Sequence, residues 1–353
     1  MRRTIVSIAL SAGMIHGAGA DGIGVIAPLS GPSALLGQQM RAGAEIAAAD
    51  LGVTLTVRDD ACTAQGGEGA ARDMVAAKVA AVTGFLCTEA IEAALPVLTT
   101  AGIPVVTPGV RTNSLTDRRK KTGWLVYRLG PRADDERAAT AAILTRLWRD
   151  ELFAIIDDGT IYGRELAESF RNAAEQNGLK PVFVDTFRPQ LDNQVATVGR
   201  LRKAGATRVL VGGDREDIAI LARDAAALGN GMIFAGGEGL RGAPGETPLA
   251  AGTIMIGLPE WSDGASPEVL SRFSERQVVP EGYALPAYAA VEVATQALEA
   301  ALTSGRPVTE TLAGHDFVTA IGTVRFDTDG NLGDNPYRAF VYDGTRFVPM
   351  EVP

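Results

Sequence analysis

Residues 80–107, AAVTGFLCTEAIEAALPVLTTAGIPVVT, hold the pattern that decides the fold. An apolar run, Ala80–Phe85, precedes an amphipathic stretch, Ile91–Ala101, and a second apolar run, Ile103–Thr107. Short apolar runs that alternate with helix-length amphipathic segments are typical of β-α-β units, in which parallel strands are joined by right-handed crossovers. The runs are continuously apolar, as expected of strands that helices cover on both faces. This stretch therefore predicts a buried parallel sheet.

The same alternation continues on both sides of this stretch. Strands are expected at residues 23–29, 53–57, 125–128, 152–156, 182–187, 209–211, 232–235, 252–256, 323–326, 337–342 and 347–349. Helices are expected at residues 38–50, 69–78, 134–149, 164–177, 195–203, 217–228, 268–276 and 286–302. Near the C-terminus, Asp329-Gly330 and Asp343-Gly344 favour hairpin turns. So many β-α elements exceed one open sheet, and the chain is predicted to fold into two α/β lobes.

The composition excludes several classes of function. The chain has 353 residues, of which 46% are hydrophobic, and a formal net charge of −9 at pH 7. An acidic chain has little with which to neutralise phosphate, so a nucleic-acid partner is not expected. Two histidines and two cysteines cannot supply most His-based metal sites or a zinc site made of four cysteines. The sequence therefore predicts no metal centre and no nucleic-acid binding.

The short motifs of catalytic and cofactor sites are absent or out of context. Residues 22–27, GIGVIA, fit the dinucleotide pattern G-x-G-x-x-A, but they lie inside the first expected strand rather than before a helix. The chain lacks the P-loop and G-x-S-x-G motifs. Asp327–Asn331 resembles the start of a calcium loop, but its glycine is misplaced and Arg338 stands where a bidentate glutamate is needed, so a hairpin turn is the better interpretation. Neither an enzyme activity nor a cofactor is predicted.

The first twenty residues have the three parts of a secretory signal peptide. Met1-Arg2-Arg3 is a positive start, Thr4–Ile15 is apolar but too short to span a bilayer, and Ala18-Gly19-Ala20 matches a cleavage site. The alternative is an ordinary buried first strand or helix. A signal peptide at residues 1–20 predicts export to the periplasm, an oxidising compartment in which Cys62 and Cys87 can pair.

A series of short motifs runs along the remaining chain. They are Leu29-Ser-Gly-Pro32 with Gly37 and Gly43-Ala-Glu45, Asp59-Asp-Ala-Cys62, Gly84-Phe-Leu-Cys87-Thr88, Gly102-Ile-Pro104 with Thr107-Pro108, Tyr162-Gly163, Gly237-Glu238-Gly239, Tyr288-Ala-Ala and Phe326-Asp-x-x-Gly330. Each alone is a common turn or helix start. In this order they resemble the periplasmic solute-binding proteins of the branched-chain amino-acid (Leu/Ile/Val) type, which serve ABC importers.

The resemblance covers residues 21–353 and implies the type I periplasmic binding fold, an α/β architecture of two Rossmann-like lobes with parallel-sheet cores joined by three hinge crossings. It places lobe one at 21–131 plus 259–336 and lobe two at 132–258 plus 337–353. The implied function is capture of an amino acid or related small polar carboxylate in the interlobe cleft, by a monomer that delivers it to an ABC permease in the inner membrane. A sensor of the same fold, which signals to a receptor or regulator, is the alternative.

The two cysteines stand at the family's positions, so the resemblance implies a disulfide between Cys62 and Cys87. Closing a loop of about 25 residues would stabilise the fold by roughly 3 kcal/mol in the chain-entropy model.

Four residues match ligand-binding positions of the family. Thr88 matches a Ser or Thr that binds the ligand carboxylate, although it could also cap the following helix. Gly109 matches a position whose carbonyl accepts from the ligand ammonium, and Tyr162 matches a tyrosine of the second lobe that closes over the ligand. Glu238 matches the acid that pairs with the ammonium, and its flanking glycines suggest open access; the alternative is a solvated turn glutamate.

Other positions depart from the family's pattern. Arg111 replaces a threonine, Asp214 replaces an aromatic residue and Leu36 replaces a pocket tyrosine, whereas Tyr283 keeps an aromatic residue. An Arg and an Asp facing a ligand would disfavour an aliphatic side chain, and Arg suits a carboxylate. These differences predict a solute with a second polar group and weak binding of leucine, isoleucine and valine. The alternative is that Arg111 and Asp214 pair with each other or with solvent at the rim.

Overall fold

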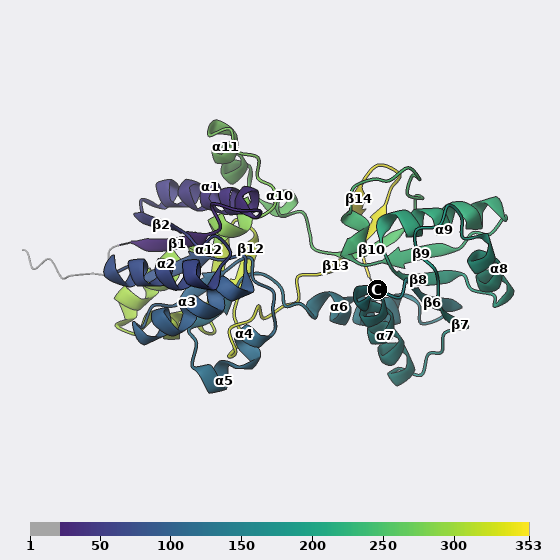
Figure 1. Ribbon diagram of the computed structural model, residues 1–353, viewed down its shortest axis with the longest axis horizontal. Coiled ribbons are helices and arrows are strands. Elements are labelled where there is room, and N and C mark those ends of the chain that lie inside the picture. Colours follow the sequence, from purple (N-terminus) through teal and green to yellow (C-terminus); the bar gives the residue numbers. More distant parts are fainter. Residues whose placement is uncertain (1–21, 353) are drawn as a thin grey trace, which may run out of the picture.

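The computed structural model describes residues 22–352 and consists of two α/β lobes (Figure 1). The signal peptide predicted at residues 1–20 lies outside the described residues. Within the described range, no helix is both long enough and apolar enough to cross a membrane. The two lobes confirm the predicted fold class.

Lobe one is built on a parallel sheet with the strand order β2-β1-β3-β4-β5. Its strands are β1 (Ile23–Ala27), β2 (Leu55–Asp59), β3 (Ala81–Gly84), β4 (Val105–Thr107) and β5 (Val126–Arg128). Its main helices are α1 (Ala34–Leu51), α2 (Ala64–Ala76), α3 (Thr88–Thr100) and α12 (Ala284–Ser304). Helices α1 and α12 pack together on one face of the sheet, and α2 and α3 on the other.

The inner strand β1 shows why these segments are continuously apolar in the sequence. Successive side chains of a strand point to opposite faces. Ile23 and Val25 pack in the core with α1 and α12, whereas Ile26 packs in the core with α2 and α3. Every residue of β1 is therefore buried.

Lobe two is built on a mixed sheet with the strand order β14-β13-β10-β9-β8-β6-β7. The parallel strands are β6 (Phe153–Asp157), β7 (Phe183–Thr186), β8 (Arg208–Gly212), β9 (Ile233–Gly236) and β10 (Ile254–Gly257). The antiparallel strands are β13 (Arg338–Tyr342) and β14 (Phe347–Pro349), which join at the predicted Asp343-Gly344 turn. The helices are α6 (Asp135–Leu147), α7 (Ile161–Gln176), α8 (Val195–Lys203), α9 (Arg215–Ala227) and the 3₁₀ turn η1 (Glu238–Arg241).

Smaller elements complete the fold, and sequence periodicity missed most of them. The helices α4 (Ser114–Asp117), α5 (Arg119–Thr122), α10 (Trp261–Gly264) and α13 (Val308–Leu312) have only four or five residues each. A hairpin pairs β11 (Asp316–Thr319) with β12 (Gly322–Arg325), and α11 (Pro267–Glu275) lies where a helix was expected. The predicted turn at Asp327–Asn331 is confirmed, because Phe326 and Leu332 form an antiparallel bridge across it.

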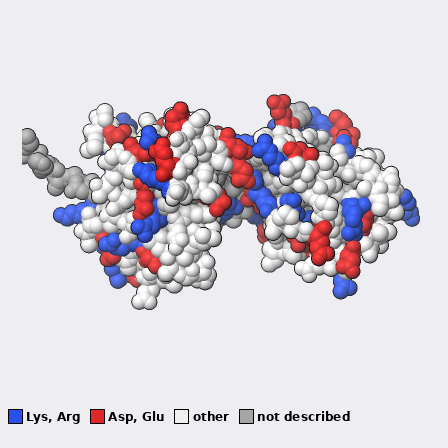
Figure 2. Space-filling view, turned by 90° about the horizontal axis from the view of Figure 1, so that it is seen from above, with Lys and Arg blue, Asp and Glu red and all other residues white. Residues whose placement is uncertain are grey.

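The two lobes are connected by three segments within residues 22–352 (Figure 1). The first joins β5 to α6, the second joins β10 to α10, and the third leads from Gly333 into β13. The molecule narrows between the lobes, and acidic and basic side chains gather there (Figure 2).

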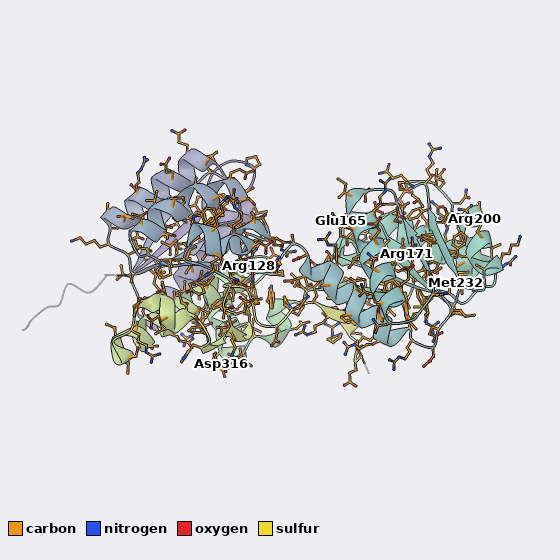
Figure 3. The ribbon with its side chains drawn as sticks, turned by 90° about the horizontal axis from the view of Figure 1, so that it is seen from below. Arg128, Glu165, Arg171, Arg200, Met232 and Asp316 are labelled. Carbon is orange, nitrogen blue, oxygen red and sulfur yellow. A yellow bond between two sulfur atoms is a disulfide. The ribbon has the colours of Figure 1, made fainter. Side chains whose placement is uncertain are left out.

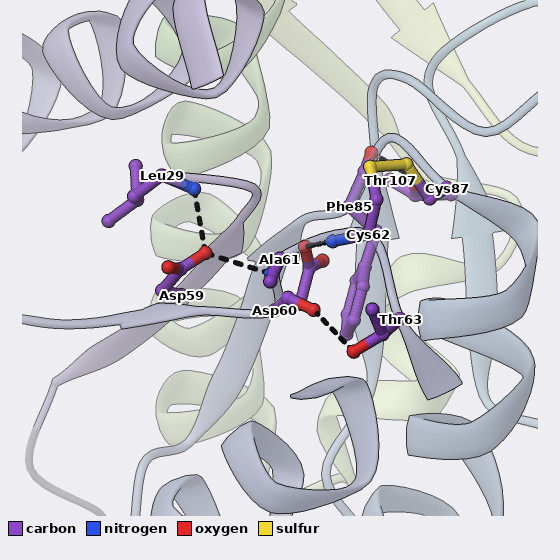
Figure 4. The surroundings of a disulfide bond; sticks show 9 residues. All are labelled: Leu29, Asp59, Asp60, Ala61, Cys62, Thr63, Phe85, Cys87 and Thr107. Atoms are coloured by element: carbon purple, nitrogen blue, oxygen red, sulfur yellow. Dashed lines mark hydrogen bonds between the residues drawn. A yellow bond between two sulfur atoms is a disulfide. The ribbon is translucent and has the colours of Figure 1, made fainter. Parts of the chain in front are cut away.

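The predicted disulfide between Cys62 and Cys87 is present, with a Cα–Cα distance of 5.2 Å (Figure 4). It joins the loop after β2 to the loop after β3, at the carboxyl edge of the lobe-one sheet. Asp60 is fully buried beside it and accepts a hydrogen bond from the Cys62 N–H at 2.9 Å. The Asp59 carboxylate accepts a hydrogen bond from the N–H of Leu29, so the loop after β1 is attached to the end of β2, next to the disulfide.

Candidate functional site

The predicted ligand-binding residues lie where parallel strands end. In lobe one, Thr88 follows β3 and Arg111 follows β4. In lobe two, Tyr162 follows β6, Asp214 follows β8 and Glu238 follows β9. Open α/β sheets bind ligands beyond the carboxyl ends of their strands, so these two edges form the candidate site.

The edge of lobe one carries an apolar surface. Leu29, Leu86 and Tyr283 are partly buried around Ala27, Met40 and Ala287. Leu36, in the first turn of α1, is 40% exposed. These side chains can contact the apolar part of a solute, but they offer it no charge.

Gly109 lies in the loop after β4, and Thr88 directly follows the adjacent loop after β3. Gly109 is buried, and an ideal Cβ at this position would lie 2.4 Å from Leu86 Cδ2 and 2.7 Å from the Phe85 carbonyl oxygen. Only glycine therefore lets the loop after β4 pack so closely on the loop after β3. Thr88 is the first residue of α3 and is partly exposed, whereas Cys87 occupies the N-cap position. The alternative that Thr88 caps α3 is therefore wrong.

Arg111 is held at the junction of the two lobes. Its carbonyl accepts from the N–H of Ala133 in the first connecting segment at 2.8 Å. Its Nη1 donates to the Tyr337 hydroxyl at 3.2 Å and lies 3.8 Å from Glu238 Oε2. The Arg111 side chain is 40% exposed, so these partners leave part of the guanidinium accessible.

The loop that carries Arg111 rests on a second arginine. Arg128 is fully buried on the side of lobe one that faces lobe two (Figure 3). It donates to the carbonyl oxygens of Val110 at 3.0 Å and Thr112 at 2.8 Å, which flank Arg111. Burial lowers the pKa of Arg128 to about 10, so the side chain stays charged at neutral pH. Arg128 thus fixes the backbone on both sides of Arg111.

Glu238 is held in place and is not an open turn residue. Its Oε1 accepts from the Leu258 N–H at 2.8 Å and from Arg241 Nε at 3.3 Å, and its side chain is only 21% exposed. Leu258 begins the second connecting segment. The solvated-turn alternative is therefore wrong, because Glu238 folds back onto this segment through Oε1 while Oε2 faces Arg111.

Glu136, at the start of α6, belongs to the site and was missed by the sequence analysis. Its Oε1 accepts from the Tyr162 hydroxyl at 2.6 Å and from the Glu238 N–H at 2.7 Å. Burial raises the pKa of Glu136, and the nearby Glu238 carboxylate adds to this effect. In the sequence, Glu136 looks like one more acid in the first turn of a helix, which is a common place for acids.

The glycine before Glu238 makes this contact possible. An ideal Cβ at Gly237 would lie 2.1 Å from Glu136 Oε1 and 2.4 Å from the Tyr162 hydroxyl oxygen. Gly237 therefore provides room for the Tyr162–Glu136 hydrogen bond rather than access to Glu238. Thr160 caps α7 by accepting from the Gly163 N–H at 3.0 Å, which places Tyr162 in the first turn. We call Arg111, Glu136, Tyr162, Glu238 and Tyr337 the interlobe cluster.

Asp214 lies on the same edge of lobe two but outside the interlobe cluster. It is the N-cap of α9 and accepts from the Asp217 N–H at 3.0 Å. Its neighbour Gly213 lies beside Gly239, so β8 and β9 end next to each other. Within residues 22–352 the carboxylate beside Arg111 is Glu238 and not Asp214, so the alternative that Arg111 and Asp214 pair with each other is wrong.

The cluster contains carboxylates, but it is not arranged as a metal site. Within the described residues, no group of three or more His, Cys, Asp or Glu side chains is placed to hold a metal ion. The arrangement offers one accessible guanidinium and two carboxylates, which suits a small solute with charged groups.

Comparison with known proteins identifies the family. The family model described as periplasmic binding protein matches residues 22–346. The chain belongs to this family. The resemblance drawn from the sequence motifs is thereby confirmed.

Individual members of the family extend this match. Leu/Ile/Val-binding protein homolog 3 of Brucella melitensis biotype 1 is 30% identical over 364 residues, which cover 98% of each chain. A Rhodospirillum rubrum structure described as a branched-chain amino acid ABC transporter has a TM-score of 0.78 at 19% identity and covers 94% of this chain and 100% of its own. An R. palustris ABC transporter solute-binding protein in complex with 4-hydroxybenzoate has a TM-score of 0.62 at 17% identity, with 94% and 96% coverage. These two structures share the fold.

Proposed function

We propose that this protein is the periplasmic solute-binding component of an ABC importer and that it captures an amino acid or a related small carboxylate between its lobes. Export would depend on the signal peptide at residues 1–20. Family membership and the B. melitensis relative support solute binding, and the R. palustris complex shows that this fold also holds an aromatic carboxylate. The observation that carries the proposal is the Arg111–Glu238 pair, which joins the carboxyl edges of the two lobes.

The pair gives a solute one partner of each sign. Arg111 Nη1 and Glu238 Oε2 are 3.8 Å apart, which is longer than a direct hydrogen bond. A ligand carboxylate can therefore replace Glu238 as the partner of the Arg111 guanidinium. Thr88, on the same lobe, can donate a hydrogen bond from its hydroxyl to this carboxylate. A ligand ammonium can bind between Glu238 and the Gly109 carbonyl. Tyr162 and Tyr283 then cover the ligand from opposite lobes.

Ligand binding would shift the two lobes toward a closed state. In this proposal lobe one, 21–131 plus 259–336, moves as one body against lobe two, 132–258 plus 337–353. Contacts that a solute makes to both lobes exist only when the lobes approach, so the solute favours closure by its differential affinity. A permease can then distinguish loaded from empty protein.

The first experiment is native mass spectrometry of the protein purified from periplasm, followed by calorimetry with amino acids and small aliphatic and aromatic acids. We expect a retained small carboxylate and a fall in the radius of gyration on saturation, measured by small-angle scattering. We also expect leucine, isoleucine and valine to bind weakly. Submicromolar leucine binding would refute the specificity, and the absence of any carboxylate ligand would refute the function.

The importer and the sensor predict different partners. In an importer, loaded protein should stimulate the ATPase activity of the reconstituted permease. If it does not, although the ligand binds and the lobes close, a sensor of the same fold becomes the better assignment.

A further inference from the structure

Lobe two contains a pocket at the N-terminal end of α9, outside the interlobe cluster. Its volume is about 560 Å³. The lining residues are Gln190, Leu191, Asp192, Asp214, Glu216, Asp217, Ile220, Arg223, Gly245, Glu246 and Thr247. They come from the loop after β7, from one face of α9, and from the loop between η1 and β10.

The charges of this lining are strongly unbalanced. Among the described lining residues, five are carboxylates and one is an arginine. That arginine, Arg223, already donates to Asp224 Oδ1 at 2.9 Å and to the Asp192 carbonyl at 2.7 Å. The pocket therefore keeps a large excess of negative charge.

Two of the carboxylates fix the walls of the pocket with one oxygen each. Asp217 Oδ1 accepts from the Gln190 N–H at 2.8 Å, and Glu216 Oε1 accepts from the Thr247 N–H at 3.0 Å. These bonds attach both loops to the first turn of α9, so the pocket walls are held in a defined arrangement.

The second oxygen of each carboxylate has no hydrogen-bond partner among the described residues. These atoms are Asp217 Oδ2 and Glu216 Oε2, and both are buried. Asp217 as a whole is only 1% exposed. A buried carboxylate oxygen without a donor is unfavourable, and a bound N–H donor with a positive charge would relieve it. The helix-capping role of Asp214 does not account for these two atoms.

We propose that this pocket binds an organic cation through an ammonium or guanidinium group. Several N–H donors on one planar or tetrahedral cation can reach carboxylate oxygens spread along a wall. A metal ion would need at least three ligands around one point, and the described residues contain no such group. The pocket volume lies in the range of small-molecule sites. The cation could belong to a free amine or to a Lys or Arg side chain of a protein partner.

Protonation of the pocket gives the proposal a pH signature. Burial raises the pKa of Asp217 to about 6, and the carboxylates of Asp214, Asp158 and Glu216 add to this effect. Asp192 and Glu246 contribute further negative charge, and Arg223 is the opposing cation. Cation binding should therefore be stronger at pH 8, where Asp217 is ionised, than at pH 5.

The test uses agmatine, which carries an amine and a guanidinium but no carboxylate, so it cannot use Arg111 as an anion partner. Agmatine binding to the full chain is measured by calorimetry at pH 8 and pH 5. We expect Asp217→Asn to weaken it at least tenfold, and Asp192→Asn, at an exposed position, to weaken it severalfold if Asp217→Asn disturbs folding. Glu168→Gln, an exposed acid of α7 in the same lobe, is the matched control and should leave agmatine binding unchanged.

The outcomes separate this pocket from the interlobe site. Arg111→Ala should retain agmatine binding, and this result stands whether or not the proposed carboxylate function is correct. A peptide with blocked termini, acetyl-Gly-Arg-Gly-amide, is the second arm, and tighter binding of the peptide than of agmatine would identify a protein side chain as the source. Absence of agmatine binding, or equal loss in Asp217→Asn and Glu168→Gln, would overturn the proposal.

Discussion

The carboxyl edges of the two lobes differ in chemistry although both are built from parallel strands. The edge of lobe one is apolar around Leu29, Leu86 and Tyr283, and a disulfide fixes two of its loops. The edge of lobe two carries carboxylates, including Glu238 after β9 and Glu136 at the start of α6. Lobe one therefore supplies shape and backbone groups, whereas lobe two supplies negative charge.

Arg111 is the exception on lobe one, and it faces the carboxylate of Glu238 on lobe two. A solute must therefore satisfy both edges, with an anionic group for Arg111 and a cationic or hydrogen-bonding group for the acids.

Replacing Arg111 by Ala should weaken binding of the preferred carboxylate by about 2–5 kcal/mol, because a charge in the binding site loses its partner. Arg111→Lys should recover part of this loss, since it keeps the charge but not the planar fork. Calorimetry with the solute identified by native mass spectrometry measures both. Arg146→Ala, on α6 of lobe two and outside the cluster, is the control; unchanged affinity in Arg111→Ala would place Arg111 at the rim only.

Removing the disulfide should destabilise lobe one by about 3 kcal/mol, the chain-entropy value for a loop of this length. The variant Cys62→Ser/Cys87→Ser should unfold at lower denaturant concentration than the oxidised wild type. Adding reductant should lower the wild-type midpoint and leave that of the double variant unchanged. Equal midpoints for the oxidised wild type and the double variant would show that the loops at this edge do not need the bond.

Replacing Tyr162 by Phe should lower the free energy of unfolding by about 1 kcal/mol, because Glu136 loses a hydrogen-bond donor. Urea unfolding of the ligand-free protein measures the change. Tyr283→Phe is the matched control on lobe one, since its hydroxyl has no hydrogen-bond partner among residues 22–352. A similar loss in both variants would contradict the assigned role of the Tyr162–Glu136 contact.

Glu292, on α12 of lobe one, tests whether a buried acid matters away from the edges. Burial raises the pKa of Glu292 to about 7, with Asp50 adding to the effect, although Glu292 accepts from the Ala320 N–H at 2.7 Å. Asp50 itself accepts a hydrogen bond from the Tyr288 hydroxyl and forms a salt bridge with Arg272.

The sign of the pH effect follows from this raised pKa. The folded protein holds the Glu292 proton more tightly than the unfolded chain, so this contribution to stability is complete below about pH 4.5 and is lost as pH rises through about 7. Glu292→Gln should therefore be more stable than wild type at pH 8, by about 1 kcal/mol or less after solvent screening. Denaturation at pH 5 and pH 8 measures this, and an equal difference at both pH values would contradict it.

Much of the fold could be predicted from the sequence because the relevant signals are local. The apolar runs predicted the buried strands, the Asp-Gly pair at Asp343-Gly344 predicted a hairpin, and the cysteine positions of the family predicted the Cys62–Cys87 bond. The start of α7 was predicted less accurately. The helix was expected from Arg164, but it begins at Ile161, directly after the Thr160 cap. The hairpin strand β11 was missed because exposed residues interrupt its pattern.

The candidate site could be only partly predicted, because its contacts join distant parts of the chain. The family resemblance named Arg111, Tyr162 and Glu238 as ligand-binding positions, and the structure places them after β4, β6 and β9. The partnership of Glu136 with Glu238 spans 102 residues, and no periodicity or spacing encodes such a contact. Only the tertiary structure paired Arg111 with Glu238 and folded Glu238 onto Leu258. The physical reason is that residue type and spacing specify helices, strands and turns, whereas the pairing of charges depends on how the lobes pack around their connecting segments.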